Sequence, residues 1–341
     1  MTRLWIRHET RSTERRAPVS PADARALVAA GVGITVEDSP QRVFATSDYR
    51  AAGCAVAEAG SWVDAPDDVV VVGLKELPDG GPLRHRHIYF GHAYKGQAGA
   101  GELLARFAEG GGVLMDLEYL TDDAGRRLAA FGYWAGYVGA ALAVLHLRGA
   151  LTTPLAPTSR EALDAALAEP GAPMTALVVG ALGRCGRGAR DALVRAGVTP
   201  TEWDVAETAD LDRPALLRHD VLVNAVLSTA PIPPFVTSAD LDNPDRLLRV
   251  LSDVTCDVTS ECNVLPVNDA LTSWEAPTRE LRGGARPVDV IAIDNLPSLL
   301  PVEAGLSFSA DLAPHLVDLD SAPWRRATAL FRSAVKENAH A

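Results

Sequence analysis

The feature that most constrains the fold of this chain is a regular alternation of short apolar runs with helical patterns. In the first third the apolar runs are LWI (residues 4–6), GITVE, DDVVVVG, HIYFGH and GGVLMDLE. Helical patterns lie between them, such as SPADARALVAAG, in which Ser20 is placed as the N-cap, and GELLARFAEGG. Because strands that alternate with helices form mainly parallel sheets, the pattern predicts an α/β fold.

A second alternation starts near residue 174, so the pattern predicts more than one domain. It begins with MTALVVGALGRCGRGA and continues through VTPTEWD, HDVLVNAVL, LLRVLSDVT and VDVIAIDNLPS. The 341 residues exceed the roughly 100–200 of one typical domain. We expect one domain formed by residues 1–135 with 320–341, and a second domain formed by residues 136–319.

Three segments complete the predicted architecture. A long helix is predicted from Asp123 onward, over AGRRLAAFGYWAGYVGAALAVLHL. The Pro- and Thr-containing stretch TTPLAPTSREALDAALAEPGAP is the expected inter-domain region. The last segment, SAPWRRATALFRSAVKENA, is predicted to form a helix that begins at Ser321 and packs on the first domain.

Composition favours small-molecule chemistry. The formal charge is −12 and no Lys/Arg-rich block occurs, which disfavours nucleic-acid and anionic membrane partners. The longest weakly polar run, residues 131–147, is shorter than the ~20 apolar residues that span a bilayer and predicts a buried helix. Four cysteines without C-x-x-C spacing, and no leader before the first predicted strand, favour a cytoplasmic location.

Lysine is rare in this sequence. Of 32 basic residues only Lys75, Lys95 and Lys336 are lysines. Arginine stays protonated in proteins, whereas a desolvated lysine can lose its proton. A lysine kept among arginines is therefore a candidate for proton transfer, although three residues are few enough to occur by chance.

The stretch TALVVGALGRCGRGA predicts a dinucleotide-binding turn. It places Gly180, Gly183 and Gly186 between an apolar strand and a helix, where glycines allow a pyrophosphate to approach the helix N-terminus. A second strand ends at Asp204, whose carboxylate can accept hydrogen bonds from ribose hydroxyls and would repel a 2′-phosphate. NAD is therefore favoured over NADP; the alternative is a tight turn without ligand.

The stretch RHRHIYFGHAYKGQ raises three possibilities, namely a metal site, a catalytic site or a strand that carries imidazoles. His85 and His87 share one face of the predicted strand, but no H-E-x-x-H or C-x-x-C motif supplies further ligands, so no metal is expected. His92 follows the strand, at the end where α/β sheets carry functional groups. Lys75 follows the preceding strand in the same way, which predicts that both face one cleft.

Several long segments of the chain resemble the saccharopine dehydrogenases of the NAD-dependent, L-lysine-forming type, which are related to the alanine dehydrogenase/transhydrogenase superfamily. The resemblance is carried by RHETRSTERRAPVSP, GSWVDAPDDVVVVGLKELP, HIYFGHAYKGQAG, DLEYLTDDAGRRLAAFGYWAG, VVGALGRCGRGA, WDVAET, PIPPF and IDNLPSLLP. It implies two Rossmann-like domains with parallel sheets and an active-site cleft between them. The N-terminal domain, residues 1–135 with 320–341, would be the substrate and catalytic domain, and residues 136–319 would form the NAD-binding domain. It also implies NAD as cofactor, a place in lysine metabolism and amino-acid biosynthesis, and saccharopine, L-lysine and 2-oxoglutarate as small-molecule substrates of a monomer or small homo-oligomer.

The resemblance also assigns candidate site residues. It implies an acid–base pair, matched by Lys75 and His92. The residues implied to bind substrate are Arg11, Glu14, Arg16, Glu76, Lys95, Gln97, Glu118, Arg126 and Arg127. The cofactor contacts that we expect are Gly180, Leu182, Gly183, Arg184, Gly186, Asp204 and Asp257.

The residue types suit the oxidation of a secondary amine. The amine must lose a proton before it can release a hydride, and a lysine whose pKa is lowered towards neutrality can accept that proton. Hydrolysis of the resulting imine needs a group that takes a proton from water and later returns it, which suits His92. The arginine pair Arg126 and Arg127 can bind a dicarboxylate, and Glu76 and Glu118 suit an ammonium group. Taken singly, Arg126 and Arg127 are better read as a solvated helix face, Glu118 as a surface carboxylate and Lys95 as an exposed charge.

The chain departs from the family pattern at a few positions. Arg11 replaces a lysine, Asn295 and Val302 replace a histidine and an arginine, and Cys256 and Cys262 lie in a variable stretch. The changes keep two alternatives open. One is a related opine- or imine-forming dehydrogenase that joins an oxo acid to a different amine; the other is a non-catalytic NAD-binding sensor. A zinc hydrolase ranks behind both.

Overall fold

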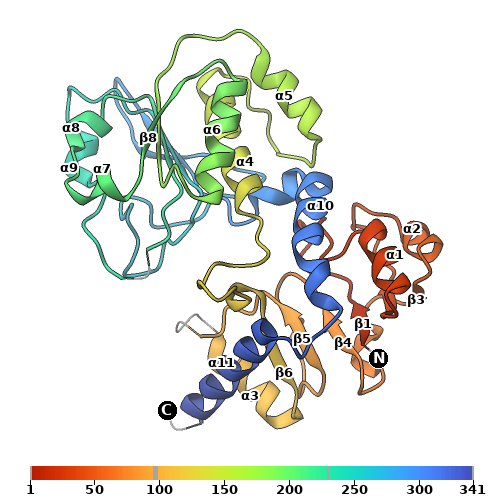
Figure 1. Cartoon of the computed structure of the whole chain (residues 1–341). Helices are drawn as coiled ribbons and strands as arrows, with labels where there is room; N and C mark the ends of the chain where they lie inside the picture. The colour runs from red at the N-terminus through yellow and green to blue at the C-terminus, as the bar shows by residue number, and fades with distance from the viewer. Residues whose placement is uncertain (1, 95–98, 229, 340–341) are drawn as a thin grey trace. The chain divides into compact units, whose positions relative to one another are not determined.

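The chain forms two compact units, each built around one six-stranded sheet (Figure 1). The computed structural model describes residues 2–94, 99–228 and 230–339. Unit 1 comprises Met1–Ala130 and Ala304–Ala341, and unit 2 comprises Phe131–Glu303. The alternation of strands and helices predicted from the sequence is confirmed in both units.

The sheet of unit 1 is parallel throughout, with the strand order β3-β2-β1-β4-β5-β6. This is the strand order of doubly wound dinucleotide-binding folds. The strands are β1 (Arg3–Ile6), β2 (Gly33–Glu37), β3 (Ala55–Ala57), β4 (Val70–Val72), β5 (Arg86–Tyr89) and β6 (Val113–Asp116). The helices are α1 (Pro21–Ala29), α2 (Thr46–Ala51), η1 (Ser61–Asp64), α3 (Ala100–Gly110), η2 (Leu117–Tyr119), η4 (Ala313–Leu316) and α11 (Ala322–Asn338).

The predicted capping and packing of two helices in unit 1 are confirmed. The hydroxyl of Ser20 accepts a hydrogen bond from the backbone N–H of Asp23 at 3.1 Å, so Ser20 is the N-cap of α1. The C-terminal helix α11 follows Ser321 and packs beside α3 and β6. Its Phe331 is buried against Phe107 of α3, with ring centroids 5.5 Å apart.

The sheet of unit 2 has the order β11-β12-β10-β9-β7-β8, and all its strands are parallel except β11. The strands are β7 (Ala176–Val179), β8 (Pro200–Trp203), β9 (Val221–Asn224), β10 (Val250–Asp253), β11 (Arg279–Arg282) and β12 (Val288–Ile291). The helices are α4 (Gly132–Leu147), α5 (Arg160–Ala168), α6 (Arg184–Arg195), α7 (Val205–Ala209), α8 (Arg213–Leu216), α9 (Ser238–Asp242) and η3 (Leu296–Leu299); α10 (Pro301–Leu312) begins in unit 2 and continues into unit 1.

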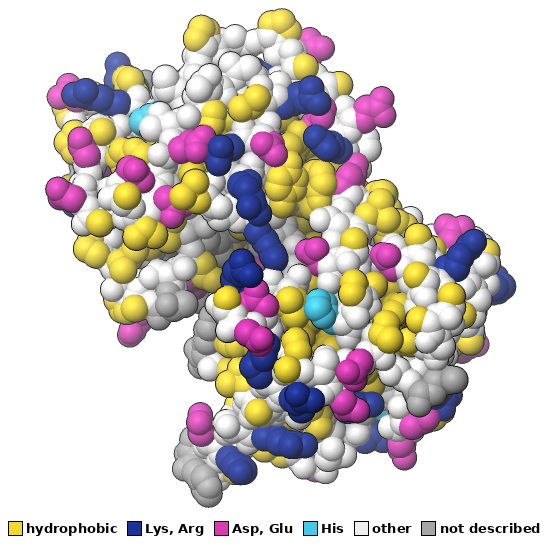
Figure 2. Space-filling view, viewed as in Figure 1, with side chains coloured by type: hydrophobic (Ala, Val, Ile, Leu, Met, Phe, Trp, Pro, Cys, Tyr) yellow, Lys and Arg dark blue, Asp and Glu magenta, His cyan; other side chains and the backbone are white. Residues whose placement is uncertain are grey.

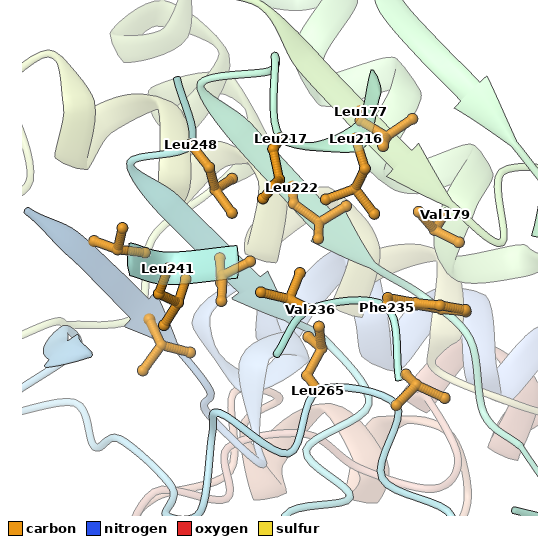
Figure 3. Close-up of a cluster of buried hydrophobic side chains, with 14 of the residues drawn as sticks. Leu177, Val179, Leu216, Leu217, Leu222, Phe235, Val236, Leu241, Leu248 and Leu265 are labelled. Carbon is orange, nitrogen blue, oxygen red and sulfur yellow. The ribbon is translucent and has the colours of Figure 1, made fainter. Parts of the chain in front are cut away.

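Two sets of contacts hold unit 2 together. A cluster of buried side chains joins the sheet to the segments that cover it, among them Leu177 of β7, Leu222 of β9 and Phe235 (Figure 3). Behind the sheet, α4 crosses α6 so closely that only glycine fits at the contact. A Cβ added at Gly136 would lie 1.8 Å from the carbonyl oxygen of Cys185, and one at Gly188 would lie 1.9 Å from that of Tyr133.

The predicted long helix starts later than expected. Helix α4 begins at Gly132, and its buried residues confirm the prediction for the segment 131–147. The segment 124–130 is not helical, because Gly125 has a φ of 76° and the Asp122 carboxylate accepts the N–H groups of Ala124 and Arg126. A β-bridge joins Thr121 to Arg127 instead.

The predicted inter-domain region is wrong. The stretch 152–173 lies inside unit 2, where Leu155 N donates to Trp274 O at 2.7 Å and Thr158 N donates to Leu299 O at 2.8 Å. The chain passes between the units near residues 130 and 303, whereas the sequence placed these boundaries at 135 and 319.

The difference at the second boundary has a clear cause. The later part of α10 packs in unit 1, where Ser309 Oγ accepts from Ser20 N at 2.7 Å and the rings of Phe308 and Phe90 lie 5.9 Å apart.

Among the described residues, no helix is both long and apolar enough to cross a membrane.

Candidate active site

The strand order of unit 1 reverses between β1 and β4, and the candidate base lies at this point. From β1 the sheet continues to β2 on one side and to β4 on the other, which makes the carboxyl ends of β1 and β4 the topological switch point. Ligands of open α/β sheets bind outside the carboxyl ends of strands at such a point. Lys75 follows the end of β4 at Val72 by three residues.

Lys75 and His92 are carried by two segments that run side by side. Strand β4 pairs with β5 in parallel, and the pairing continues beyond both strands, where Gly73 N donates to Ile88 O at 2.9 Å. Phe90 N then donates to Leu74 O at 3.2 Å. A backbone hydrogen bond thus joins the segment just before Lys75 to the segment just before His92, at one edge of the sheet.

His92 has an unusual backbone conformation. Its φ is 49°, in the left-handed region that only a few per cent of residues other than glycine adopt, with asparagine, aspartate and histidine the most frequent among them. Its imidazole is exposed and stacks on the ring of Phe90, with centroids 6.4 Å apart and planes 21° apart. Backbone strain of this kind is concentrated at functional sites.

Asp116, at the end of β6, lies beside the turn that carries His92. Strands β5 and β6 pair with Tyr89 opposite Asp116, and the carboxylate accepts from Glu118 N at 2.9 Å. Burial raises the pKa of Asp116 to about 6, and the backbone N–H groups of Glu118, Gly91 and His92 partly offset this effect. A carboxyl group that titrates near neutrality thus lies behind the candidate acid–base histidine.

Two carboxylates on which the charge of Lys75 acts are paired with arginines. Glu76 forms a bidentate pair with Arg11, in which both N–O distances are 2.9 Å. Glu14 and Arg16 form a buried pair with distances of 2.8 and 2.6 Å. Burial opposes the ionisation of Glu14, but Arg16 and the charge of Lys75 keep the pKa of Glu14 below its ordinary value. The charge of Lys75 thus acts on the carboxylate of the Glu14–Arg16 pair.

The remaining predicted substrate residues are distributed unevenly. Arg127 pairs with Glu118 at 2.9 Å, so these two candidates lie together at the start of the segment after β6. Arg126 instead pairs with Asp122, and its side chain is 80% exposed, as expected for a solvated surface charge. Lys95 and Gln97 lie outside the described residues.

His85 and His87 are buried and packed within unit 1, as expected of residues with a structural role. His85 Nε2 lies 3.0 Å from the carbonyl oxygen of Ala65. His87 is fully buried, with its ring edge-on to Trp62 and Phe107 at centroid distances of 5.1 and 5.4 Å. Burial lowers the pKa of His87 well below its ordinary value, so the ring is neutral. Among the described residues, no group of three or more His, Cys, Asp or Glu side chains could hold a metal ion.

The glycine turn of unit 2 lies at the second switch point, between β7 and β9. Gly180 has a φ of 81°, and a Cβ added at Gly186 would lie 2.1 Å from the carbonyl oxygen of Gly180. Gly183 is the N-cap of α6, and no side chain caps that helix. The turn therefore leaves the backbone N–H groups at the start of α6 able to approach a phosphate, which fits a dinucleotide.

The structure brings Asp204 to this turn, because its Oδ2 accepts from Leu182 N at 2.9 Å. Its other oxygen accepts from Val205 N at 2.9 Å and caps α7. Leu182 is 67% exposed and Arg184 is the first residue of α6. Asp257 lies on the loop after β10, the neighbour of β9, directly after Cys256 with its φ of 54°. All predicted cofactor residues therefore lie at the carboxyl edge of one sheet.

The sequence analysis missed three buried charged residues at the unit 1 site, namely Arg7, Glu9 and Asp116. Arg7 and Glu9 directly follow β1, and Asp116 ends β6. Each is at most 5% exposed. Their position at the ends of apolar runs was a usable signal, because buried charges are rare and usually have a specific partner.

Comparison with solved structures defines the class of fold. An L-alanine dehydrogenase matches 99% of this chain and 100% of its own, with a TM-score of 0.68 and 17% identity. The transhydrogenase from Sinorhizobium meliloti matches 92% of this chain and 93% of its own, with a TM-score of 0.65 and 17% identity. The family alanine dehydrogenase/PNT, N-terminal domain, matches residues 5–138. The chain thus has the α/β fold of these enzymes, with two Rossmann-like domains.

Sequence relatives define the family within this class. A saccharopine dehydrogenase [NAD(+), L-lysine-forming] from Emericella nidulans is 41% identical over 364 residues, covering 98% of this chain and 97% of that protein. The enzyme of the same name from Schizosaccharomyces pombe is 39% identical over 362 residues, covering 98% of each. The chain belongs to the family of NAD-dependent, L-lysine-forming saccharopine dehydrogenases, which confirms the resemblance predicted from its motifs.

Proposed function

We propose that the protein catalyses the NAD-dependent oxidative deamination of saccharopine to L-lysine and 2-oxoglutarate, and the reverse condensation. The observation that carries the proposal is the hydrogen bond from Phe90 N to Leu74 O. It sets the segments of Lys75 and His92 side by side, next to the switch point between β1 and β4. The membership of the chain in the family whose members carry this name supports the substrate.

The glycine turn, Asp204 and Asp257 of unit 2 are the residues that would hold NAD. The left-handed Gly180 and the close approach of Gly186 supply the cradle, and the Asp204 carboxylate suits ribose hydroxyls better than a 2′-phosphate. When bound, NAD⁺ supplies an acceptor for the hydride that leaves the carbon attached to the secondary amine.

Lys75 would accept the proton of the substrate's secondary ammonium, which frees the nitrogen lone pair. The carboxylates of Glu76 and Glu14, on which the charge of Lys75 acts, are themselves paired with Arg11 and Arg16. The same arginines carry the positive charge that suits the carboxylates of the substrate.

His92 would serve the second half of the reaction. Oxidation leaves a carbon–nitrogen double bond, and His92 takes a proton from the water that attacks its carbon. The protonated imidazole would then return this proton to the nitrogen. As the bond between carbon and nitrogen breaks, the hydroxyl group formed on the carbon gives its proton to the imidazole, which leaves 2-oxoglutarate and lysine. The exposed position of the ring is suited to an exchange with water.

We also infer a protein that acts on small molecules in the cytoplasm, without nucleic acid, as a monomer or small homo-oligomer. The charge of −12 supports the absence of a nucleic-acid partner, as do the acidic side chains interspersed with basic ones on the face in Figure 2. Light scattering of the purified protein would test the oligomeric state.

A panel of amines with 2-oxoglutarate and NADH tests the proposed substrate. NADH consumption should be fastest with L-lysine, and NAD⁺ should be reduced when saccharopine alone is added. Turnover of another amine with lysine inert would contradict the substrate, and NADH binding without turnover of any amine would contradict the enzyme.

A further inference from the structure

Two buried charged side chains that the proposed reaction does not use lie against the backbone of Lys75. Arg7 and Glu9 follow β1, and they are 1% and 5% exposed. Their side chains form an ion pair, with Arg7 Nη2 3.2 Å from Glu9 Oε2. The pair lies at the switch point, where the ends of β1 and β4 are adjacent.

The pair holds the peptide groups on both sides of Lys75. The carboxylate of Glu9 accepts the backbone N–H of Leu74 at 2.7 Å and that of Lys75 at 3.1 Å. The guanidinium of Arg7 donates to the carbonyl oxygen of Lys75, and it lies 3.4 Å from that of Glu76. One ion pair thus accepts from the N–H groups of Leu74 and Lys75 and donates to the carbonyl oxygen of Lys75.

Gly73 makes room for this arrangement. A Cβ at residue 73 would lie 2.3 Å from Arg7 Nε, which no side chain could tolerate without displacing the guanidinium. The guanidinium also lies over the ring of Tyr89, with 5.8 Å between Cζ and the ring centroid. These contacts hold the guanidinium of Arg7 in the position from which it binds the carbonyl oxygen of Lys75.

Stability alone is a weak reason for such a pair. Burial raises the pKa of Glu9 even though Arg7 lies beside it, which shows that the site disfavours the charge. Buried ion pairs can often be replaced by apolar side chains without loss of stability. A role in positioning Lys75 would explain why two charged residues are buried where the ends of β1 and β4 meet.

We propose that Arg7 and Glu9 are positioning residues, which fix the backbone of Lys75 and thereby the direction from which its amino group meets the substrate nitrogen. The inference rests on the proposed function of Lys75 as the base. It assigns the pair no contact with substrate, so substrate and cofactor affinity should depend on it little.

The variants Glu9→Gln and Arg7→Met test the proposal in the full-length protein, with saccharopine and NAD⁺ as substrates. We expect kcat to fall by about tenfold to a hundredfold, because small misplacements of a catalytic group have effects of this size. The KM for NAD⁺ should stay within about twofold, and the limb of the pH–rate profile that reports the base should shift. Arg7→Lys should fall between wild type and Arg7→Met.

Asp220→Asn is the matched control. Asp220 also accepts a backbone N–H, that of Thr175 at 2.8 Å, and pairs with an arginine, Arg249, at 3.1 Å. It lies at the amino ends of the strands of unit 2, away from the candidate residues. Its substitution should leave kcat and the pH–rate profile unchanged.

The double variant Arg7→Met/Glu9→Leu keeps the test decisive if a single variant does not fold, because it removes both charges together. It should fold, bind NADH and show the same loss of kcat. A wild-type kcat and pH–rate profile in this variant or in Glu9→Gln, with Lys75→Met inactive, would overturn the inference and leave the proposed function intact. An active Lys75→Met would overturn the function itself.

Discussion

His92 is held in a left-handed backbone conformation, which for a residue of this type costs about 1–3 kcal/mol and needs support from its surroundings. Asp116 provides support, because its carboxylate faces the backbone N–H groups of Gly91 and His92. The same carboxylate is fully buried, so its charge is unfavourable for the fold. At this residue the requirements of stability and of the proposed activity oppose each other.

Asp116→Asn should therefore raise stability and lower activity. The pKa of Asp116 is raised to about 6, so the destabilising charge is present above pH 6 and is lost by protonation as the pH falls towards 4. We expect the variant to gain up to about 3 kcal/mol in unfolding free energy at pH 8 and little at pH 4.

Urea unfolding at the two pH values measures the stability difference between Asp116→Asn and wild type, and steady-state kinetics measures the loss of kcat. A gain in stability that is independent of pH would contradict the burial of the charge. A wild-type kcat would contradict the support of His92.

His87 predicts a dependence of stability on pH that is unrelated to catalysis. The unfolded chain protonates this residue near pH 6.5, whereas burial keeps the ring neutral in the folded chain. The unfolding free energy should thus fall on acidification below pH 6.5, by up to about 1.4 kcal/mol per pH unit. His87→Phe should remove this part of the slope. Fluorescence of Trp62, which contacts the ring, can follow the transition; equal slopes for both proteins would refute the assignment.

Single residues show what sequence alone could and could not predict. Lys75 and His92 could be singled out because a rare lysine and a histidine follow neighbouring apolar runs. Arg7 and Glu9 were missed because their partners are 65 or more residues away, so only the paired sheet shows what they hold. The surface exposure of Arg126 likewise depends on a turn that its sequence does not reveal.

At the scale of elements, the glycine turn makes the strongest case for the cofactor site. Gly186→Ala would bring a methyl group 2.1 Å from the carbonyl oxygen of Gly180 and force the turn apart. We expect the affinity for NADH to fall by about fivefold to 150-fold, since such overpacking costs about 1–3 kcal/mol.

Gly183→Ala is the comparison for this prediction, because its added Cβ would lie 3.4 Å from the same oxygen. Its loss of affinity should be smaller. Fluorescence titration with NADH measures both variants, and the reverse order of effects would contradict the geometry of the turn.

Elements were predicted best where the periodicity was long and strong. All residues of the segment 124–130 except Gly125 are good helix formers, yet the segment is not helical, because Gly125 and the Asp122 side chain impose a turn. Strand β11 was missed because its residues are largely polar and it pairs antiparallel at the edge of the sheet. In both segments, contacts with the rest of the structure determine the secondary structure and override the local propensity of the residues.

At the scale of the whole molecule, unit 1 is discontinuous in sequence, and its last helix returns to complete its core. Phe331→Ala should destabilise unit 1 by about 3 kcal/mol through the loss of its contact with Phe107. The affinity for NADH, which we assign to unit 2, should be retained. Thermal unfolding and NADH titration of the same sample check this, and a parallel loss of NADH binding would contradict the assignment.

The central claim is that the amino group of Lys75 and the imidazole of His92 carry out the proton transfers of an amine-oxidising dehydrogenase. The most direct test is kcat for saccharopine oxidation by Lys75→Met, measured together with the NADH dissociation constant. The account predicts that kcat falls by two to four orders of magnitude, the range typical of a lost general base, while NADH affinity is unchanged. A kcat within a few-fold of wild type in the folded variant would contradict it.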